Sequence, residues 1–142
     1  MVEIREATIL DATSIAEIST ISLGYQCDSI LVAKRIKEMD SGKQKVYVAV
    51  KNGIVTGFVH VELYQLLYQG DLVNVLGLAV RKDMQKKGYG KRLMQRVEEW
   101  AREMHCGAVR LNSAIQRSDA HEFYMALGYE NTKVQKRFVK AI

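Results

Sequence analysis

A junction in the middle of the chain constrains the fold more than any other feature. Residues 72–80 are apolar at nearly every position, which is typical of a strand covered on both of its faces. Gly88 and Gly90 follow, and apolar residues between 89 and 105 then recur at spacings of three and four, as in a helix packed against a core. This order predicts a central strand that runs through a short loop into the N-terminus of a long helix.

A loop of this kind is suited to bind an anion. The first amides of a helix have no partner within the helix, and the aligned peptide dipoles place about half a positive charge there. Glycine in the loop lets a phosphate approach the backbone closely. Residues 81–92 also carry six cationic side chains against one acid, Asp83: these are Arg81, Lys82, Lys86, Lys87, Lys91 and Arg92. Because cations are the unfavourable charge at a helix N-terminus, the segment predicts a bound anion.

The spacing Gln85-x-x-Gly88-x-Gly90 differs from the two best-known phosphate loops. A Walker loop has Lys-Ser/Thr after its second glycine, and the dinucleotide fingerprint has three glycines near the start of a domain. The loop resembles that of the GNAT superfamily of N-acetyltransferases, which wraps the pyrophosphate of acetyl-CoA. The resemblance implies cofactor contacts from Gln85, Lys86, Lys87, Gly88, Tyr89, Gly90, Lys91 and Arg92. An ordinary strand-to-helix turn would show the same letters, so a second motif is needed.

That second motif is Tyr124-x-x-x-Gly128-Tyr129, which follows the loop after an intervening strand. It is similar to the end of the family's helix motif, whose tyrosine commonly lies beside the cofactor sulfur and protonates the departing thiolate. The resemblance implies this catalytic role for Tyr124. The alternative is an ordinary core tyrosine on an amphipathic helix. The presence of both motifs in this order favours the family.

Four further residues bear on the cofactor site implied by the resemblance. Asn112 and His121 are expected to contact acetyl-CoA, with a surface histidine as the alternative for His121. Arg117 stands where many members have asparagine, which leaves open the side-chain contacts to the pantetheine arm. Lys82 stands where proline often follows the central strand, a difference of little effect because the family's phosphate contacts come mostly from backbone amides.

Gly77 interrupts the apolar run of the central strand. Glycine inside a strand often marks a bulge or a close approach of another backbone. In the family the corresponding strand splays from its neighbour at this point, which implies that Leu78, Ala79 and Val80 offer backbone groups to the pantetheine and the thioester oxygen. The alternative is that the glycine relieves the packing of a helix.

The candidates for a general base lie on the preceding strand. Alternation places Phe58, His60, Glu62 and Tyr64 on one face and Val59, Val61 and Leu63 on the other, which must be core. An alkyl amine with a pKa near ~10.4 is protonated at neutral pH, so acyl transfer to it needs a proton acceptor. Glu62 is the first choice, followed by His60 and by water. A solvated strand face is the alternative.

The remaining pattern predicts a single domain over residues 1–142. Strands are expected at 2–7, 46–51, 54–63, 72–80 and 109–112, with one or two more within 129–139, and Asn52-Gly53 signals a hairpin. Four helices are expected, one of them from 89 to 105. The other three are expected to be capped by Asp11, by Asp28 or Ser29 (with Ile30, Leu31, Ala33, Ile36 and Met39 inward), and by Ser118 or Asp119. The order predicts an α/β fold, a mixed sheet with helices on both faces, and resembles the GNAT fold over essentially the full length.

Charge and composition narrow the class of ligand. The net charge is +5, and the basic residues gather in the loop but alternate with acids elsewhere, which favours a compact anion over nucleic acid or a membrane. A second basic run is expected to be a solvated strand face: Lys133, Lys136, Arg137 and Lys140. Cys27 and Cys106 predict free thiols and no metal site. Without a targeting signal or a bilayer-length apolar run, a cytoplasmic monomer or homodimer is expected.

The sequence thus predicts a GNAT-type N-acetyltransferase in which an amine attacks acetyl-CoA directly, without an acyl-enzyme. By resemblance the acceptor pocket is lined by Leu23, Tyr25, Tyr64, Leu66, Leu67 and Tyr68, which indicates a partly apolar or aromatic site. One alternative is a module of the same fold that senses acyl-CoA without turnover. A second is a basic nucleic-acid-binding domain, which would need aromatic residues interleaved with cations; the loop offers only Tyr89.

Overall fold

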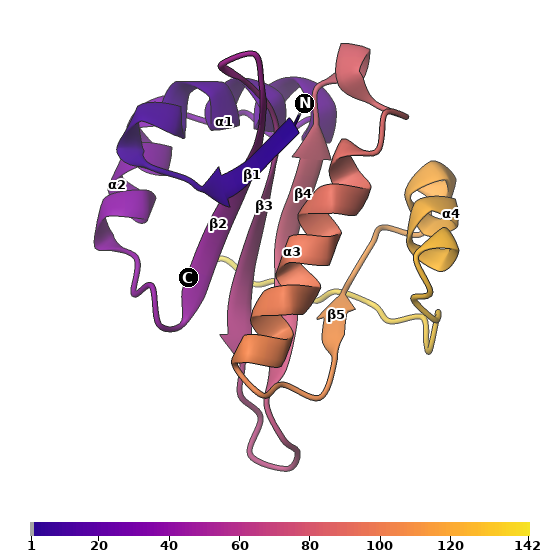
Figure 1. Cartoon of the computed structure of the whole chain (residues 1–142). Helices are drawn as coiled ribbons and strands as arrows, with labels where there is room; N and C mark the ends of the chain where they lie inside the picture. Colours follow the sequence, from indigo (N-terminus) through magenta and orange to yellow (C-terminus); the bar gives the residue numbers. More distant parts are fainter. Residues whose placement is uncertain (1) are drawn as a thin grey trace. The chain divides into compact units, whose positions relative to one another are not determined.

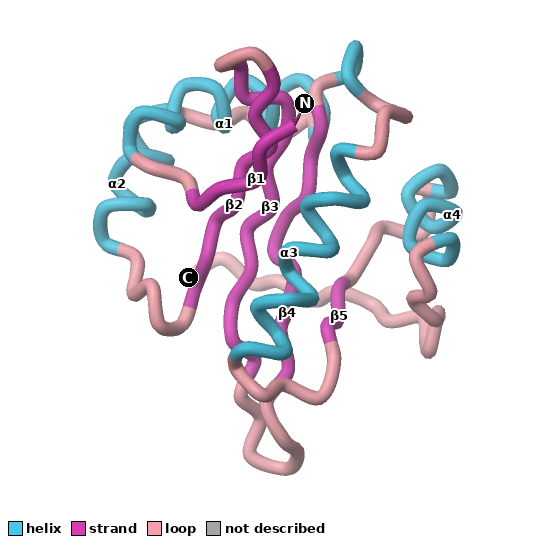
Figure 2. Tube along the Cα trace, viewed as in Figure 1, coloured by secondary structure: helices cyan, strands magenta, loops and turns pink. Residues whose placement is uncertain are grey.

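The computed structural model describes residues 2–142 and divides after Leu111 into two compact units. The first unit contains a sheet with strand order β1-β2-β3-β4-β5. The strands are β1 (Val2–Glu6), β2 (Gln44–Lys51), β3 (Ile54–Tyr64), β4 (Leu72–Val80) and β5 (Val109–Leu111). The first four are antiparallel neighbours, whereas β5 runs parallel to β4 (Figures 1 and 2). The predicted mixed sheet is therefore confirmed for this unit.

Two glycine-bearing positions fix how the central strands meet. Asn52 and Gly53 have φ of +52° and +75°, so both residues of the β2–β3 turn are left-handed, as the favoured two-residue hairpin requires. A Cβ at Gly57 would lie 2.8 Å from the carbonyl oxygen of Ala79, too close for any side chain. Glycine at this position therefore permits the close pairing of β3 with β4.

Helices cover both faces of the sheet, as predicted. On one face lies α3 (Tyr89–Glu103), whose Leu93, Met94 and Val97 are fully buried, while the guanidinium of Arg96 sits 4.7 Å from the centre of the Tyr47 ring. The other face carries α1 (Ala12–Ile18) and α2 (Ser29–Glu38). Ile15 and Ile18 of α1 form a buried cluster there with Val48 and Phe58.

The start of α1 differs from the prediction that Asp11 caps it. Thr8 instead caps a short 3-10 helix, η1 (Ile9–Asp11), and the Asp11 carboxylate accepts a hydrogen bond from the Thr8 amide at 2.8 Å. The same carboxylate binds both terminal nitrogens of Arg5, at 2.8 and 2.9 Å. The Arg5 hydrogen bond holds the pKa of this buried carboxyl below its usual value. Asp11 therefore fastens β1 to η1 and makes no side-chain bond to α1.

The cap predicted for α2 is confirmed, because Asp28 accepts a hydrogen bond from the Ile30 amide at 2.8 Å. The predicted inward face is partly wrong. Ile30 and Leu31 are 77% and 47% exposed, whereas Val32 and Ile36 pack against the core. Residues four apart share a helix face, so the buried stripe of this short helix passes through 32 and 36 and leaves position 30 outside.

The second unit, residues 112–142, contains one helix, α4 (Ser118–Ala126). Arg117 occupies its N-cap position without a side-chain bond, so neither Ser118 nor Asp119 caps it, because the helix already begins at Ser118. The strands predicted within 129–139 are absent from the structure. Every residue from Glu130 onward is exposed, and this unit holds no other strand that could pair with the segment.

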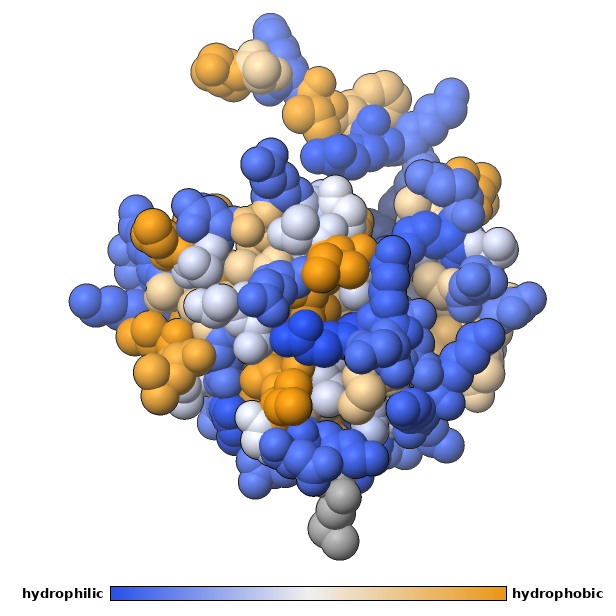
Figure 3. Space-filling view, turned by 90° about the horizontal axis from the view of Figure 1, so that it is seen from above, coloured by the Kyte–Doolittle hydropathy of each residue, from blue (hydrophilic) through white to orange (hydrophobic). Residues whose placement is uncertain are grey.

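Within the described residues no helix is long and apolar enough to cross a membrane, and no cluster of side chains suited to a metal is present. Cys27 and Cys106 are free thiols, as predicted. On the face shown in Figure 3, hydrophilic residues surround small separate groups of hydrophobic ones.

Candidate functional site

The loop after β4 presents unpaired backbone amides. It passes through a 3-10 helix, η3 (Lys82–Met84), and then adopts left-handed backbone at Lys86 and Gly88, with φ of +62° and +86°. No side chain caps α3, and its first internal hydrogen bond runs from the Arg92 amide to the Gly88 carbonyl at 3.1 Å. The amides of the first helical turn therefore have no partner in the helix, which is the arrangement that an anion site requires.

The cationic side chains of this loop are not equivalent. Arg81 is occupied, since it donates to the Val55 carbonyl at 2.8 Å and lies 3.5 Å from Glu17. The other five are exposed and form no ion pair with any residue in the described part of the chain: Lys82, Lys86, Lys87, Lys91 and Arg92. Five free cations at an uncapped helix N-terminus repel one another unless an anion binds.

Tyr89 is 5% exposed, so its ring belongs to the core and only its amide is available to a ligand. Nucleic-acid binding by base stacking would need an accessible ring. The single aromatic residue of the loop therefore does not serve that purpose.

The predicted bulge at Gly77 is confirmed. The register between β3 and β4 shifts so that His60 pairs with Gly77 and Val61 with Val75, which leaves Leu76 as the extra residue. A Cβ on Gly77 would meet no atom within 4 Å, so the glycine does not relieve helix packing. The surrounding space is open to a ligand.

Beyond the bulge, β4 has no strand partner on its β5 side. The pairing with β5 stops at Val75, although β4 continues to Val80. The Arg81 amide donates to the Thr56 carbonyl of β3 at 2.8 Å, and backbone groups alternate along a strand. The groups of Ala79 therefore point to β3, and those of Leu78 and Val80 point to the open side.

The Val80 carbonyl is already engaged. It accepts hydrogen bonds from the Ser22 hydroxyl at 3.0 Å and from the Gln85 side chain at 3.1 Å. Ser22 belongs to a short π-helix, η2 (Ser19–Leu23). Of the three residues expected to serve the pantetheine arm, Leu78 therefore offers both its amide and its carbonyl, and Val80 its amide.

Glu62 lies in a polar row that crosses three strands. Asn74 of β4 donates to Glu62 Oε2 at 2.8 Å, and Arg110 of β5 donates to Asn74 Oδ1 at 2.6 Å. Arg110 also lies over the Tyr64 ring, 4.7 Å from its centre. The sequence reasoning missed Asn74 and Arg110, although a single asparagine in an apolar strand was a visible signal. The row fixes the orientation of the Glu62 carboxylate.

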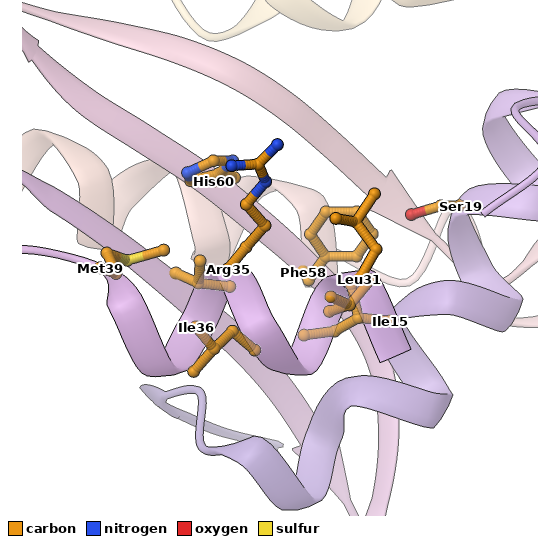
Figure 4. A pocket seen from close by; sticks show the side chains of 10 residues that line it. Ile15, Ser19, Leu31, Arg35, Ile36, Met39, Phe58 and His60 are labelled. Carbon is orange, nitrogen blue, oxygen red and sulfur yellow. The ribbon is translucent and has the colours of Figure 1, made fainter. Parts of the chain in front are cut away.

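His60 lies beside a cavity of about 200 Å³ between β2, β3 and the first two helices (Figure 4). Its Nε2 is 2.8 Å from Gln44 Oε1. Burial lowers the pKa of the imidazole, and the charge of Glu62 opposes this in part. His60 is therefore largely neutral at pH 7 and able to accept a proton. Its face of β3 opens into a cleft.

The first two helices line this cavity as expected, but the predicted pocket residues do not. The lining consists of Ile15, Ser19, Leu31, Val32, Arg35, Ile36, Met39, Val46, Phe58 and His60. Tyr25, Leu67 and Tyr68, which were expected in the pocket, are exposed by 68%, 106% and 81%. The cavity side chains come instead from the middle of α2 and from the strands beneath it.

In the second unit, Tyr124 is half-buried between two aromatic rings. The ring centres of Phe123 and Tyr129 lie 5.1 and 6.0 Å from that of Tyr124. Burial raises the pKa of the Tyr124 hydroxyl, and Arg117 opposes this in part. The hydroxyl is therefore protonated at neutral pH. Gly128, with φ of +94°, ends α4 in the manner predicted.

The two other residues expected at the cofactor site of this unit are placed as follows. His121 Nε2 lies 2.9 Å from the Ala114 carbonyl, which ties the ring to the turn before α4. Asn112 is exposed and begins the unit. Their contacts with acetyl-CoA stay a prediction.

These features agree with a known family. The sequence profile of the acetyltransferase (GNAT) family matches residues 12–129. The chain belongs to this family. As a GNAT protein, it is an acyltransferase that places an acetyl group on an amine.

Two curated relatives are N-acetyltransferases. The uncharacterized N-acetyltransferase YhdJ of Bacillus subtilis is 38% identical over 58 residues, which cover 41% of each chain. The aminoalkylphosphonate N-acetyltransferase of Salmonella typhimurium is 28% identical over 145 residues, covering 99% of this chain and 91% of that protein. The second match extends along the whole GNAT chain, whereas the first spans about two fifths of its relative.

Solved structures support the same fold. The aminoglycoside N-acetyltransferase AAC(6')-Iy in complex with CoA has a TM-score of 0.87, with 100% of this chain and 96% of that chain covered. The sequences are 16% identical, so the similarity establishes the GNAT fold alone.

The environment of His60 gives a prediction that needs no substrate. Its imidazole should titrate below the ordinary pKa of 6.5. Removing the Glu62 charge in Glu62→Gln should lower the pKa further, because that charge favours the imidazolium. Proton NMR of the ring across pH 4 to 8 measures both, with Glu103→Gln on the opposite helix as the control. A Glu62→Gln titration that overlays the wild type would contradict the coupling.

Proposed function

We propose that this GNAT enzyme transfers the acetyl group of acetyl-CoA to the primary amine of a small molecule. The observation that carries the proposal is the uncapped N-terminus of α3 at the end of a bulged strand. The free amides and unpaired cations at this helix start can bind the phosphates of acetyl-CoA. The unpaired backbone groups of Leu78 can hydrogen-bond to the amides of its pantetheine arm. A relative in the family has been solved with CoA.

The residues of the loop fit the donor in chemical type. The left-handed backbone at Lys86 and Gly88 exposes successive amides, which bind phosphate oxygens. Lys87, Lys91 and Arg92 supply the neutralising charge. Acetyl-CoA, when bound, supplies a thioester whose carbonyl carbon is open to attack. The amides of Leu78 and Val80 would polarise that carbonyl.

The proposed reaction is a direct transfer. The amine gives up a proton to Glu62, and its lone pair forms the new C–N bond to the thioester carbon. The C–S bond breaks, and the sulfur takes the proton of the Tyr124 hydroxyl. The nitrogen of the new amide gives its second proton to the Tyr124 phenolate, and Glu62 releases its proton to water, so the products are an N-acetylated amine, free CoA and one proton.

Glu62 is proposed as the base for a structural reason. Asn74 holds one carboxylate oxygen, Oε2, and Arg110 holds Asn74. The other oxygen, Oε1, accepts no hydrogen bond from the described residues, so it is available to an amine. His60, neutral and on the same face of β3, is the second candidate.

The overall proposal is tested by thiol release. Purified protein with acetyl-CoA and a panel of amines should release CoA at a rate above spontaneous hydrolysis, and mass spectrometry should find the acceptor heavier by one acetyl group. The panel should span amino acids, aminoalkylphosphonates, polyamines and aminoglycosides. Binding of acetyl-CoA without release in any of these would favour the acyl-CoA-sensing alternative.

Replacing Gly88 should weaken donor binding. The φ of +86° strains any side chain at this position, so Gly88→Val should distort the amide array. We expect the Kd for acetyl-CoA to rise at least about tenfold, or about 1.4 kcal/mol, in calorimetry. Gly107→Val is the control, because a Cβ there meets nothing within 4 Å. Equal affinities in folded variants would remove the loop from the donor site.

Tyr124→Phe tests the proposed acid. It should lower kcat by roughly 10² or more with little change in donor affinity, since general acid catalysis contributes about 10²–10⁴. Tyr47→Phe makes the same chemical change at a buried hydroxyl that has no hydrogen-bond partner among the described residues. That control should keep its rate. Similar rates for the two variants would assign Tyr124 to packing alone.

A further inference from the structure

The cavity beside His60 is apolar except at its ends. Leu31, Ile36 and Met39 from the α2 side face Ile15 and Phe58 across it. Arg35 and His60 both line the cavity, and Figure 4 shows the Arg35 side chain pointing from α2 toward His60. Ser19 lies at the other end. An occupant therefore meets one strongly polar end and apolar walls.

The polar end lies next to the bulge. His60 pairs with Gly77, the residue after the extra Leu76. Glu62 is two residues further along the same face of β3, about 7 Å away at the usual rise per residue. In the proposed function, the thioester is polarised by the adjoining stretch of β4. An amine at the polar end of the cavity would thus be close to both the base and the acyl carbon.

Arg35 gives the cavity a positive charge that an anionic group of a ligand can pair with. It is exposed and forms no ion pair with the residues described here. The same helix carries Lys34 and Lys37 against one acid, Glu38, so α2 has a net positive charge. A guanidinium binds carboxylate and phosphonate through paired hydrogen bonds. A polycationic acceptor would be repelled by this group.

The size of the cavity limits the occupant. Its volume of about 200 Å³ is below the range of roughly 300–1,000 Å³ of drug-sized sites. A single amino acid is of suitable size, whereas a multi-ring aminoglycoside would extend beyond the cavity.

We propose that the acceptor is a small amine with an anionic group on the carbon that bears the nitrogen and an apolar side group, that is, an apolar α-amino acid or its 1-aminoalkylphosphonate analogue. This rests on the proposed acetyl transfer. The anion pairs with Arg35, the amine faces Glu62 and His60, and the side group fills the space between Leu31 and Phe58. The guanidinium of Arg35 and the imidazole of His60 line the same cavity, which suits an acceptor that carries both an anion and an amine.

Three acceptors with one side group test this. Leucine and 1-amino-3-methylbutylphosphonate carry the anion, whereas 3-methylbutylamine lacks it. With acetyl-CoA, kcat/KM for at least one anionic acceptor should exceed that for 3-methylbutylamine about tenfold or more. The ratio between leucine and the phosphonate shows which anion the site prefers.

Two variants assign the effect to Arg35. Arg35→Gln should lower kcat/KM for the better anionic acceptor at least about tenfold, mainly through KM, and leave 3-methylbutylamine nearly unchanged. Lys34→Gln removes the same charge from α2 at a position outside the cavity and should alter neither. Circular dichroism verifies that both variants fold.

The outcomes separate this proposal from the one on which it rests. Equal use of 3-methylbutylamine, or an equal loss with all acceptors in Arg35→Gln, would overturn the acceptor class. Turnover of other amines in the panel, with none of these three acceptors used, would also overturn the acceptor class. Acetyl transfer would still stand in that case. An absence of CoA release with every amine would contradict acetyl transfer itself.

Discussion

The pairing of β3 with β4 is the contact on which the rest of the first unit depends. Gly57 lets the strands approach, and the extra residue Leu76 reverses the alternation of β4. Before the bulge, Val73 and Val75 share the α3 face with Val61; after it, Ala79 shares the other face with Phe58. Because of one inserted residue, β4 contributes buried side chains to the cores on both faces of the sheet. It also turns the backbone of Leu78 toward the edge that β5 does not cover.

Charge is arranged differently at the two ends of α3. Toward its C-terminus, Arg96 lies 3.2 Å from Glu103 and 3.5 Å from Glu99, so the cation is paired. At its N-terminus, the exposed cations have no acidic partner among the described residues. Like charges at the wrong end of a dipole lower the stability of the free protein. A bound polyanion removes this penalty, so affinity for the donor and stability of the fold are linked at this helix end.

Features encoded by neighbouring residues were predicted well from the sequence, and those that depend on distant contacts were not. The Asn52-Gly53 hairpin, the Asp28 cap and the short connection from the central strand into the long helix are local and were confirmed. The inward position of Ile30 and the strand within 129–139 were wrong, since each depends on what another element covers or pairs with. For the same reason Asn74, Arg110 and Arg35 escaped notice. Their roles depend on contacts with residues across the sheet or on a facing helix. Periodicity along one segment does not reveal such contacts.

The short π-helix η2 touches both the cavity and the end of β4. Ser19, at its first residue, lines the cavity, and Ser22, one turn on, holds the Val80 carbonyl together with Gln85 from the phosphate-type loop. The five residues of η2 therefore lie between the end of β4, next to the loop, and the wall of the cavity. The proposed donor and acceptor sites therefore share one short structural element.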